Sequence, residues 1–551
     1  MPVDFKRSNK KSGKVYELWE ILEKFGSYQL LQYLYICLPT VFITMGHINY
    51  VFVVQDVGYR CRIPECDNLN PTFQVEWWPN NTLNRCSKPI LKTTIVSDFG
   101  NCSAENFSEE TGPCDSWIYE SNNSVVTELN LACKSWHINS VGTIHNLGML
   151  LAMLVTGWIA DRFGRKHALV FSMLISSVGL FKIFATSYYL YVSIEFLEAL
   201  LGGGSYSIAM VLMIEITGRK QRILSGVLFA YAIYMGESLF AVIAMFVHNW
   251  KKLVLITYVP PIFCILLTFL LHESPRWLIL NGKTKQAITN LTEIANKNKM
   301  KVNMQDFSDI DANKLKEKFN IENYETKEGL KAVFTSIEMM KRLMVASFCR
   351  FTSNFVYYGI MINSVWLPGD KYVNFLLSTV MSFPGELISL YLMNKIGRKL
   401  PLIVGFIFCG GLCILSAFVP ATLGWAKILL FLSGKVVMSA CFTGAITYCM
   451  ELFPTSARGS LLGLCAFAAR LGGMLAPLTP VLNDISEILP ALCFGASSVI
   501  TGFSIILTPE TKHLPLMDTI EQVETSVRKT REKCEIDNSG FVNDEKTFTK
   551  L

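Results

Sequence analysis

The stretch GWIADRFGRK at residues 157–166 decides the fold of this chain, because part of it recurs in the second half of the 551 residues. Asp161–Lys166 reads DRFGRK and Asn394–Lys399 reads NKIGRK, at an offset of 233 residues (164 to 397). Two downstream glutamates recur at offsets of 236 and 237 residues, in the pairs Glu215 with Glu451 and Glu273 with Glu510. Three charged clusters in one order predict that the chain contains two copies of one unit.

Long apolar segments separate these clusters. The chain is 51% hydrophobic and only 17% charged, with a mean hydropathy of +0.35, which excludes a soluble enzyme and predicts a polytopic membrane protein. A membrane-spanning helix needs about 20 mostly apolar residues. Twelve segments qualify: 28–54, 138–160, 168–186, 188–213, 223–248, 252–271, 342–363, 372–393, 400–420, 424–449, 460–482 and 487–507. Duplicated halves built from membrane spans are typical of transporters that rock about a central site.

These spans divide the chain into parts. We predict an N-terminal arm (1–27), a first six-span half (28–271) with one long loop (55–137), a Lys-rich linker (272–341), a second six-span half (342–507) and a polar tail (508–551).

Basic residues predict how the chain crosses the membrane. The N-terminal arm and the short loops at 161–166, 218–222 and 394–399 are rich in Lys and Arg, and such loops stay cytoplasmic. We therefore expect a multi-pass protein of the plasma membrane with both termini in the cytoplasm and residues 55–137 outside the cell. The net charge of +6 follows from this arrangement and predicts no nucleic-acid partner.

The long loop has the composition of an extracellular segment. It carries four glycosylation sequons, at Asn80, Asn101, Asn106 and Asn122. It also holds six of the sixteen cysteines, which are Cys61, Cys66, Cys86, Cys102, Cys114 and Cys133. An oxidising compartment favours disulfides among them, and fifteen connectivities are open.

The motifs resemble those of a known superfamily. Gly157-x-x-x-Asp161-Arg-x-Gly-Arg-Lys resembles the loop motif of the major facilitator superfamily. Glu273–Leu278 (ESPRWL), Glu451–Gly459 (ELFPTSARG) and the sequon-bearing loop narrow the resemblance to the organic ion transporter family, the organic cation, organic anion and carnitine carriers of solute carrier family 22. The resemblance covers about residues 20–510. It implies an all-α integral membrane fold of twelve helices in two six-helix bundles, with a central cavity that opens alternately to each side.

The repeated charges have a predicted mechanical role. The cytoplasmic ends of the two halves must hold together when a carrier faces outward and separate when it faces inward, and Arg binds carboxylates bidentately. We predict a state-dependent latch between Asp161, Arg165, Glu215, Glu273 and Arg276 of the first half and Arg398, Glu451, Arg458 and Glu510 of the second. The alternative, that these charges only set topology, gives no role to the repeated glutamates.

Charged residues within the spans are candidates for substrate contact, because burying a charge in a membrane is costly. Arg470 can hold a carboxylate or sulfate, and the resemblance implies Arg at this position in the anion and carnitine branches and Asp in the cation branch. Lys435 resembles a Gly-Lys pair of the same branches. The alternatives are that Arg470 pairs with a neighbouring carboxylate and that Lys435 snorkels to the interface.

Acidic residues within the spans complicate a simple anion site. Glu386 and Glu237 lie in the middle of their spans and either form salt bridges with Arg470 or Lys435, or belong to a bipolar site that binds an amine and an acid group together. A bipolar site suits a zwitterion such as carnitine, a betaine or an amino-acid derivative. Glu195 and Glu198 in the fourth span have no assigned role, and a coupling proton on a desolvated carboxylate is one option.

Aromatic residues of the seventh span are further candidates. Tyr357 and Tyr358 offer cation–π contact to a quaternary amine, although aromatic residues in spans also serve as packing.

These features predict a secondary-active or facilitative carrier of small organic ions by alternating access, with zwitterions or organic anions favoured. The alternatives are an organic cation transporter and a non-transporting receptor on the same fold. His-Glu-x-x-His, Gly-x-Ser-x-Gly and a complete phosphate-binding loop are missing from the sequence, so we predict no catalytic residue, no metal and no cofactor. The expected partners are the substrate, a coupled or exchanged ion and the lipid bilayer.

Overall fold

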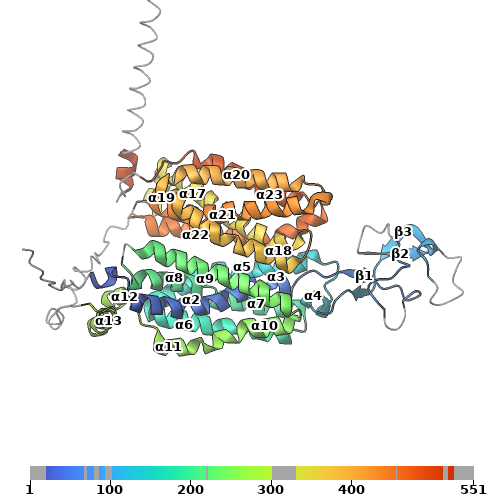
Figure 1. Ribbon diagram of the computed structural model, residues 1–551, viewed down its shortest axis with the longest axis horizontal. Coiled ribbons are helices and arrows are strands. Elements are labelled where there is room, and N and C mark those ends of the chain that lie inside the picture. Colours follow the sequence, from blue (N-terminus) through green and yellow to red (C-terminus); the bar gives the residue numbers. More distant parts are fainter. Residues whose placement is uncertain are drawn as a thin grey trace, which may run out of the picture.

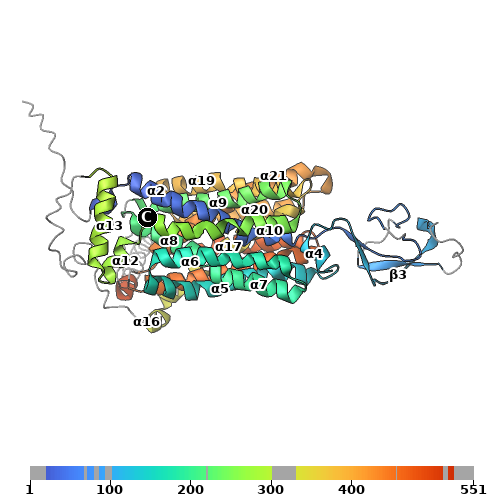
Figure 2. The same ribbon diagram turned by 90° about the horizontal axis from the view of Figure 1, so that it is seen from below.

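The computed structural model of the chain describes residues 20–67, 71–79, 86–92, 102–218, 221–300, 330–454, 456–512 and 519–525. Two bundles of helices lie side by side, and the long loop projects from one end of the first bundle (Figure 1). At the opposite end, α12 (Pro275–Leu280) and α13 (Thr284–Lys297) of the linker lie across the helices (Figure 2). We call these two ends the loop end and the linker end.

Each bundle contains six spans, several of which are broken helices. The first bundle consists of α2 (Ser27–Ile48) with α3 (Tyr50–Val53), α5 (Ser135–Phe163), α6 (Arg165–Ile175) with η2 (Ser176–Phe184), α7 (Tyr188–Gly202) with α8 (Ser205–Ile216), α9 (Arg222–Phe246), and α10 (Trp250–Tyr258) with η4 (Pro260–Leu266) and α11 (Leu267–Leu270). The second consists of α17 (Ile337–Asn363) with η5 (Ser364–Trp366), α18 (Lys371–Val380) with α19 (Ser382–Lys395), α20 (Lys399–Ala417), α21 (Gly424–Leu452), α22 (Arg458–Leu475) with η7 (Ala476–Asp484), and α23 (Leu489–Ile505).

All twelve predicted spans are helical in the structure, and their bounds agree to within a few residues. Ten are helices long and apolar enough to cross a membrane, and α17 and α23 complete the twelve. α17 has sufficient length but contains Arg342, Arg350 and many buried polar residues, because it lies in the interior of its bundle. It begins at Ile337, inside the predicted linker 272–341, where the Ser336 hydroxyl caps it by accepting from the Met339 N–H.

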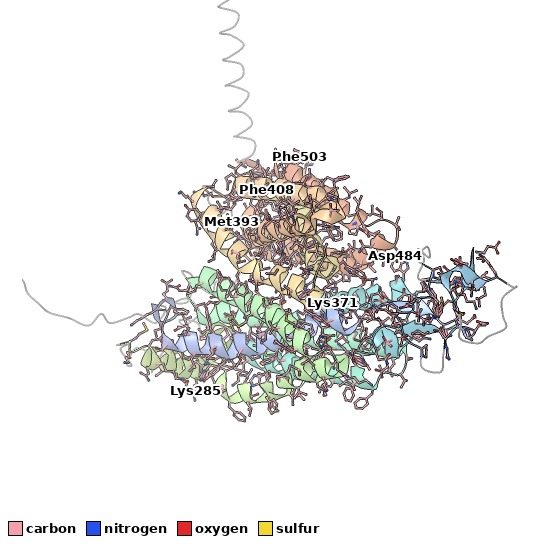
Figure 3. The ribbon with its side chains drawn as sticks, turned by 45° about the vertical axis from the view of Figure 1, so that its right-hand side comes forward. Lys285, Lys371, Met393, Phe408, Asp484 and Phe503 are labelled. Carbon is pink, nitrogen blue, oxygen red and sulfur yellow. A yellow bond between two sulfur atoms is a disulfide. The ribbon has the colours of Figure 1, made fainter. Side chains whose placement is uncertain are left out.

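The outer surface of the bundles is apolar, as a bilayer requires. Phe408 of α20 and Phe503 of α23 are more than half exposed and point away from the first bundle, whereas Lys371 lies where the two bundles meet (Figure 3). Large exposed hydrophobic side chains occur on most of the spans, so the helices face lipid over much of their outer surface.

The long loop forms two small antiparallel sheets and a short helix. β1 (Tyr59–Cys61) pairs with β4 (Trp117–Tyr119), β2 (Ser87–Leu91) pairs with β3 (Phe107–Pro113), and α4 (Val125–Glu128) returns the chain to the membrane. All six predicted cysteines form disulfides, and the structure selects one of the fifteen connectivities: Cys61–Cys114, Cys66–Cys102 and Cys86–Cys133. Among the sequons, Asn122 is exposed and Asn106 half-buried, whereas Asn80 and Asn101 lie outside the described residues.

Candidate functional site

The two bundles contact each other from the middle of the spans to the loop end. α5 packs against α22 and η7, and α9 packs against α18. At the loop end Phe52 stacks on Tyr372 with ring centroids 5.2 Å apart. Tyr231 and Tyr234 of the first bundle contact Phe383 of the second. Among the described residues, no hydrogen bond, ion pair or ring contact joins the bundles much closer to the linker end than these.

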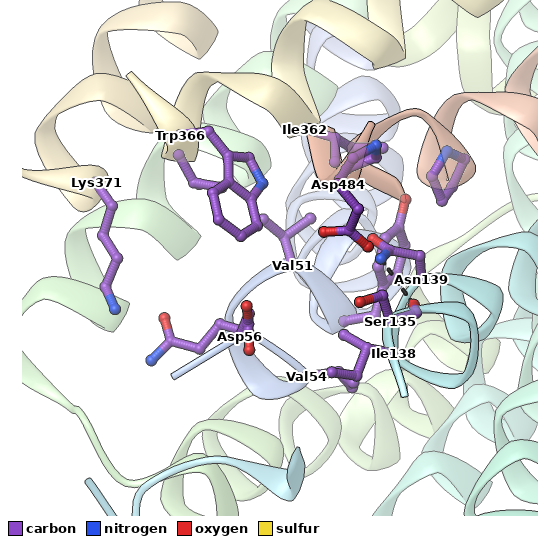
Figure 4. Close-up of a pocket in the computed structure, with 15 residues that line it drawn as sticks. Val51, Val54, Asp56, Ser135, Ile138, Asn139, Ile362, Trp366, Lys371 and Asp484 are labelled. Atoms are coloured by element: carbon purple, nitrogen blue, oxygen red, sulfur yellow. Dashed lines mark hydrogen bonds between the residues drawn. The ribbon is translucent and has the colours of Figure 1, made fainter. Parts of the chain in front are cut away.

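A cavity of about 130 Å³ lies between the bundles at the loop end (Figure 4). Trp366 and Lys371 of the second bundle face Asp56 of the first, and Asp484 lies near Ser135 and Asn139. This cavity contains none of the predicted substrate-contact residues. They lie deeper: Arg470 is on α22, and the others are on α9, α17, α19 and α21.

Glu237 and Lys435 share one partner, Tyr357. The Tyr357 hydroxyl donates to Glu237 Oε2 at 3.4 Å and lies 3.2 Å from Ser382 Oγ. The Lys435 Nζ donates to the Tyr357 carbonyl at 3.3 Å and lies 3.2 Å from its ring centroid. Lys435 is 0% exposed, so it does not snorkel, and it attracts Glu237 electrostatically without a direct ion pair. Tyr357 thus links the Glu237 carboxylate of the first bundle to the Lys435 ammonium of the second.

Glu386 has only hydroxyl partners among the described residues. Tyr234 of the first bundle donates to Glu386 Oε2 at 3.3 Å, and Thr443 of α21 donates to the same oxygen. The carboxylate is 2% exposed. Neither Arg470 nor Lys435 forms an ion pair with it in the described part of the chain, so the salt-bridge alternative is not realised in this structure.

Arg470 lies at the boundary between the bundles, with a second arginine nearby. Its guanidinium approaches Met149 Sδ of α5 at 3.9 Å. Arg350 of α17 donates to the Phe442 carbonyl at 3.5 Å and lies over the Phe442 ring. The two guanidiniums repel each other, and Tyr358 interacts electrostatically with both. Within the described ranges neither has a carboxylate partner, so both charges are available to an anionic group.

The first set of repeated charges holds the linker end of its own bundle together. Gly164 has φ +103° and separates α5 from α6. The Glu273 carboxylate caps α6 by accepting from the backbone N–H groups of Arg165 (3.0 Å) and Lys166 (3.2 Å). The Arg165 guanidinium pairs with Asp161 at 2.9 Å and with Glu215 at 3.3 Å. An anion is favourable at a helix N-terminus because the first N–H groups lack partners.

The second set repeats this construction. Glu510 accepts from the N–H groups of Arg398 (2.9 Å) and Lys399 (2.9 Å), which begin α20, and the Arg398 guanidinium pairs with Glu451 at 2.9 Å. Partial burial raises the pKa of Glu510, but the hydrogen bonds that its carboxylate accepts from backbone N–H groups have the larger total effect, so the pKa is lowered. Asn394, which stands where the first set has Asp161, forms no ion pair with Arg398 among the described residues.

The residues of the predicted latch contact only their own bundles in the described part of this structure. In the described residues every ion pair of the two sets lies within one bundle. Arg276 is exposed, and Arg458 donates to the Phe453 carbonyl at 3.0 Å instead of to a carboxylate. Glu273 and Glu510 cap helices, a local role that sequence spacing alone did not reveal. Pairing between the bundles stays a prediction for a state in which the linker ends meet.

The first bundle contains a buried ionic network of which the sequence interpretation found only Glu195 and Glu198. Lys182 of η2 contacts Glu195 (2.8 Å) and Glu198 (3.5 Å) of α7. His145 of α5 contacts Glu195 at 2.8 Å and the His47 ring at 3.0 Å. The signal was present in the sequence: Lys182 and His145 are ionisable residues inside spans, as is Arg350.

Comparison with known proteins agrees with this architecture. The family model described as "Sugar (and other) transporter" matches residues 100–522. An organic cation transporter protein from Drosophila melanogaster is 28% identical over 521 residues, covering 92% of this chain and 94% of its own. Solute carrier family 22 member 1 from Bos taurus is 29% identical over 552 residues, covering 94% of each chain.

Solved structures show the same fold. The xylose transporter XylE from E. coli in a partially occluded inward open conformation has a TM-score of 0.59 at 15% identity, covering 89% of this chain and 100% of that one. Its inward open conformation has a TM-score of 0.57 at 16% identity, covering 89% and 97%. Two six-helix bundles that meet at charged residues define a multi-pass membrane transporter of the major facilitator superfamily. The chain belongs to the sugar (and other) transporter family, and its relatives include an organic cation transporter protein and a member of solute carrier family 22.

Proposed function

We propose that this transporter carries small zwitterions, which bear a carboxylate or similar acid group and an amine, by alternating access between the two bundles. The observation that carries the proposal is that the spans contain buried or half-buried charges of both signs that have no ion-pair partner among the described residues. Arg470 and Arg350 have no carboxylate partner among the described residues, and Glu386 is held only by hydroxyl groups.

The two charge types would recognise the two ends of such a substrate. Each guanidinium offers a planar fork of donors that fits a carboxylate. Glu386 offers a buried carboxylate beside the rings of Tyr234, Tyr231 and Phe383, and aromatic faces attract ammonium groups. A zwitterion satisfies both sites without adding net charge to the interior, which lowers the desolvation cost of its entry.

An organic cation transporter is the second candidate. Its support is the similarity to the organic cation transporter protein of Drosophila melanogaster, together with the buried carboxylates of Glu237 and Glu386. In that case Arg470 and Arg350 would serve another role, and substrates without an acid group would be transported at least as well as zwitterions.

The sidedness of transport is also a proposal. The linker end is assigned to the cytoplasm by its basic loops, and the disulfide-bonded loop to the cell exterior. The interface contacts at the loop end, together with the two inward open xylose transporter structures, favour a cytoplasm-facing state. Glycosidase treatment of wild type and Asn122→Gln, followed by gel electrophoresis, tests the assignment. An exterior loop predicts that the enzyme increases the mobility of the wild type and that Asn122→Gln lacks the part of this change due to its glycan. A wild type without glycans would argue against an exterior loop.

Uptake into vesicles containing the purified protein tests the substrate class. The probes are labelled carnitine, which carries a carboxylate and a quaternary amine, and choline, which carries only the amine. Arg470→Ala should reduce carnitine uptake by about 10–100-fold, because a hydrogen-bonded charged contact contributes about 1.5–3 kcal/mol. Choline uptake should be unchanged. Arg62→Ala, at an exposed arginine of the outer loop, is the control.

Three outcomes would count against the zwitterion site. Equal carnitine uptake by wild type and Arg470→Ala would remove Arg470 from the site. Choline transport without carnitine transport would favour the organic cation candidate. No flux of any probe in a broad panel, from protein that is correctly folded, would favour a non-transporting receptor.

A further inference from the structure

The buried ionic network of the first bundle lies apart from the proposed substrate charges and has no assigned role. It consists of His47 on α2, His145 on α5, Lys182 on η2, and Glu195 and Glu198 on α7. All five side chains are at most 6% exposed. Five ionisable groups from four spans are costly to bury together, so their presence calls for a function beyond packing.

The hydrogen bonds form one continuous chain. The Lys182 ammonium contacts both carboxylates and accepts no hydrogen bond, and it also donates to the Tyr258 hydroxyl at 2.7 Å. His145 Nδ1 lies 2.8 Å from Glu195 Oε1 and 3.6 Å from Glu198 Oε2. His145 Nε2 lies 3.0 Å from His47 Nδ1. His47 Nε2 ends the chain, buried and without a hydrogen-bond partner among the described residues.

The network is one positive charge short of neutrality. Two carboxylates face one ammonium, so neutral histidines leave a net charge of −1 in a buried site. A single added proton on the histidine pair makes the sum zero. The 3.0 Å contact between ring nitrogens needs one proton on either ring, so the pair can hold one proton or, when His145 becomes an imidazolium, two. Charge balance therefore favours uptake of one proton.

A metal ion is a poorer occupant of the same place. Ligand atoms of His145, Glu195 and Glu198 lie within 4.8 Å of one another, but the Lys182 ammonium already contacts both carboxylates. A divalent cation would have to displace this buried ammonium or lie beside it.

We propose that this network is a proton-binding site that couples proton movement to substrate movement. The coupling part rests on the proposed transport of a substrate with an acid group. A proton delivered by water forms an N–H bond at His47 Nε2, the N–H bond at His47 Nδ1 breaks, and its proton forms an N–H bond at His145 Nε2. His145 is then an imidazolium beside Glu195, and one positive charge has moved inward. Release reverses these steps.

The surrounding charges explain how substrate would affect the proton. The titratable groups that face the site are Tyr50, Tyr191, Tyr206 and Tyr258 of the first bundle and Arg470 of the second. Arg470 opposes a positive charge on His47, and an anionic group bound to Arg470 reduces that opposition. Proton and acid-bearing substrate therefore favour each other, and the effect is reciprocal by linkage.

Acid–base titration of the purified protein tests proton binding without any substrate. Glu198→Gln keeps both histidines but leaves one carboxylate against one ammonium, so the network is neutral without the extra proton. Between pH 8 and pH 5 the wild type should take up about one proton per molecule more than Glu198→Gln. Glu487→Gln, at an exposed glutamate of the loop end, should match the wild type. Identical titrations of wild type and Glu198→Gln would overturn the proposal.

Vesicle transport tests the coupling. An inward proton gradient should raise carnitine accumulation by the wild type by up to about tenfold per pH unit, as one coupled proton allows. His47→Gln leaves the ion pairs of Lys182 intact but ends the relay, so its accumulation should not respond to the gradient, while carnitine exchange continues. A response equal to that of wild type would overturn coupling. If the wild type transports no carnitine, the proposed substrate class is wrong. The acid–base titration still tests whether the network binds a proton.

Discussion

Replacement of Gly164 by alanine tests whether the repeated loop is built around the glycine. Gly164 has φ +103° and ψ +154°, a region that is essentially restricted to glycine and costs other residues about 1–3 kcal/mol. An added Cβ would also overlap Glu273 Oε2 and lie 3.3 Å from Trp277. The Glu273 carboxylate would have to move away from the first N–H groups of α6.

The expected loss of stability combines these two effects. Displacing the carboxylate removes at least one charged hydrogen bond, which is worth about 1.5–3 kcal/mol. Together with the backbone strain this gives roughly 3–6 kcal/mol, or about 6–24 °C in the apparent Tm of a bundle of this size. The measurement is thermal unfolding of the purified protein in detergent, monitored by circular dichroism at constant protein and detergent concentration.

Gly157→Ala is the matched control. Gly157 is exposed in the same helix, α5, and an added Cβ meets no atom within 4 Å. Alanine is the better helix former by about 0.8–1 kcal/mol, so this variant should be as stable as wild type or slightly more stable. If Gly164→Ala unfolds at the same temperature as Gly157→Ala, the assignment of Gly164 to a strained capping loop is wrong.

Three further predictions concern the charges and the disulfides. Because folding lowers the pKa of Glu510, this carboxylate stabilises the protein above its ordinary pKa of about 4.3, and the stabilisation is lost as the pH falls through its folded pKa. Glu510→Gln should therefore reduce the fall in apparent Tm below about pH 4.5. An unchanged dependence of Tm on pH would contradict this. Lys435→Met removes the cation that attracts the buried Glu237 carboxylate. This single variant should have a lower apparent Tm than the double variant Lys435→Met/Glu237→Gln. The reverse order would show that the two charges do not compensate each other. Cys66→Ser should make the outer loop sensitive to protease, whereas Cys37→Ser, at a free cysteine, should not; equal resistance would make the disulfide dispensable.

Local sequence signals predicted much of this protein. Hydropathy located twelve spans because each must present about 20 apolar residues to lipid, whatever its neighbours are. The repeated Gly-Arg-Lys revealed the duplication, and it also marks two loops in which a glycine with positive φ precedes a helix. α17 was recognised in spite of its polar residues, but its first turns were assigned to the linker because amphipathic ends resemble loops in composition.

The candidate site was predicted only in part. Arg470, Glu386, Glu237 and Lys435 stood out as single charges in apolar segments, yet their partners could not be read from spacing. Tyr357 joins Glu237 to Lys435 across 198 residues of sequence, and no periodicity connects those positions. For Glu386 the salt bridge was one of two alternatives, and in this structure its partners are the hydroxyl groups of Tyr234 and Thr443.

The sequence by itself determined the membrane class, the duplication, the spans and the cysteine-rich loop, because each depends on composition or on residues close together in the chain. Only the tertiary structure decided which charges meet. It placed Glu273 and Glu510 at helix N-termini, each within its own bundle, and chose one disulfide connectivity of fifteen. It also gathered five buried ionisable residues from four spans: His47, His145, Lys182, Glu195 and Glu198. The physical reason is that hydrophobicity acts on each segment separately, whereas buried charges are stabilised only by partners that packing brings to within about 3 Å.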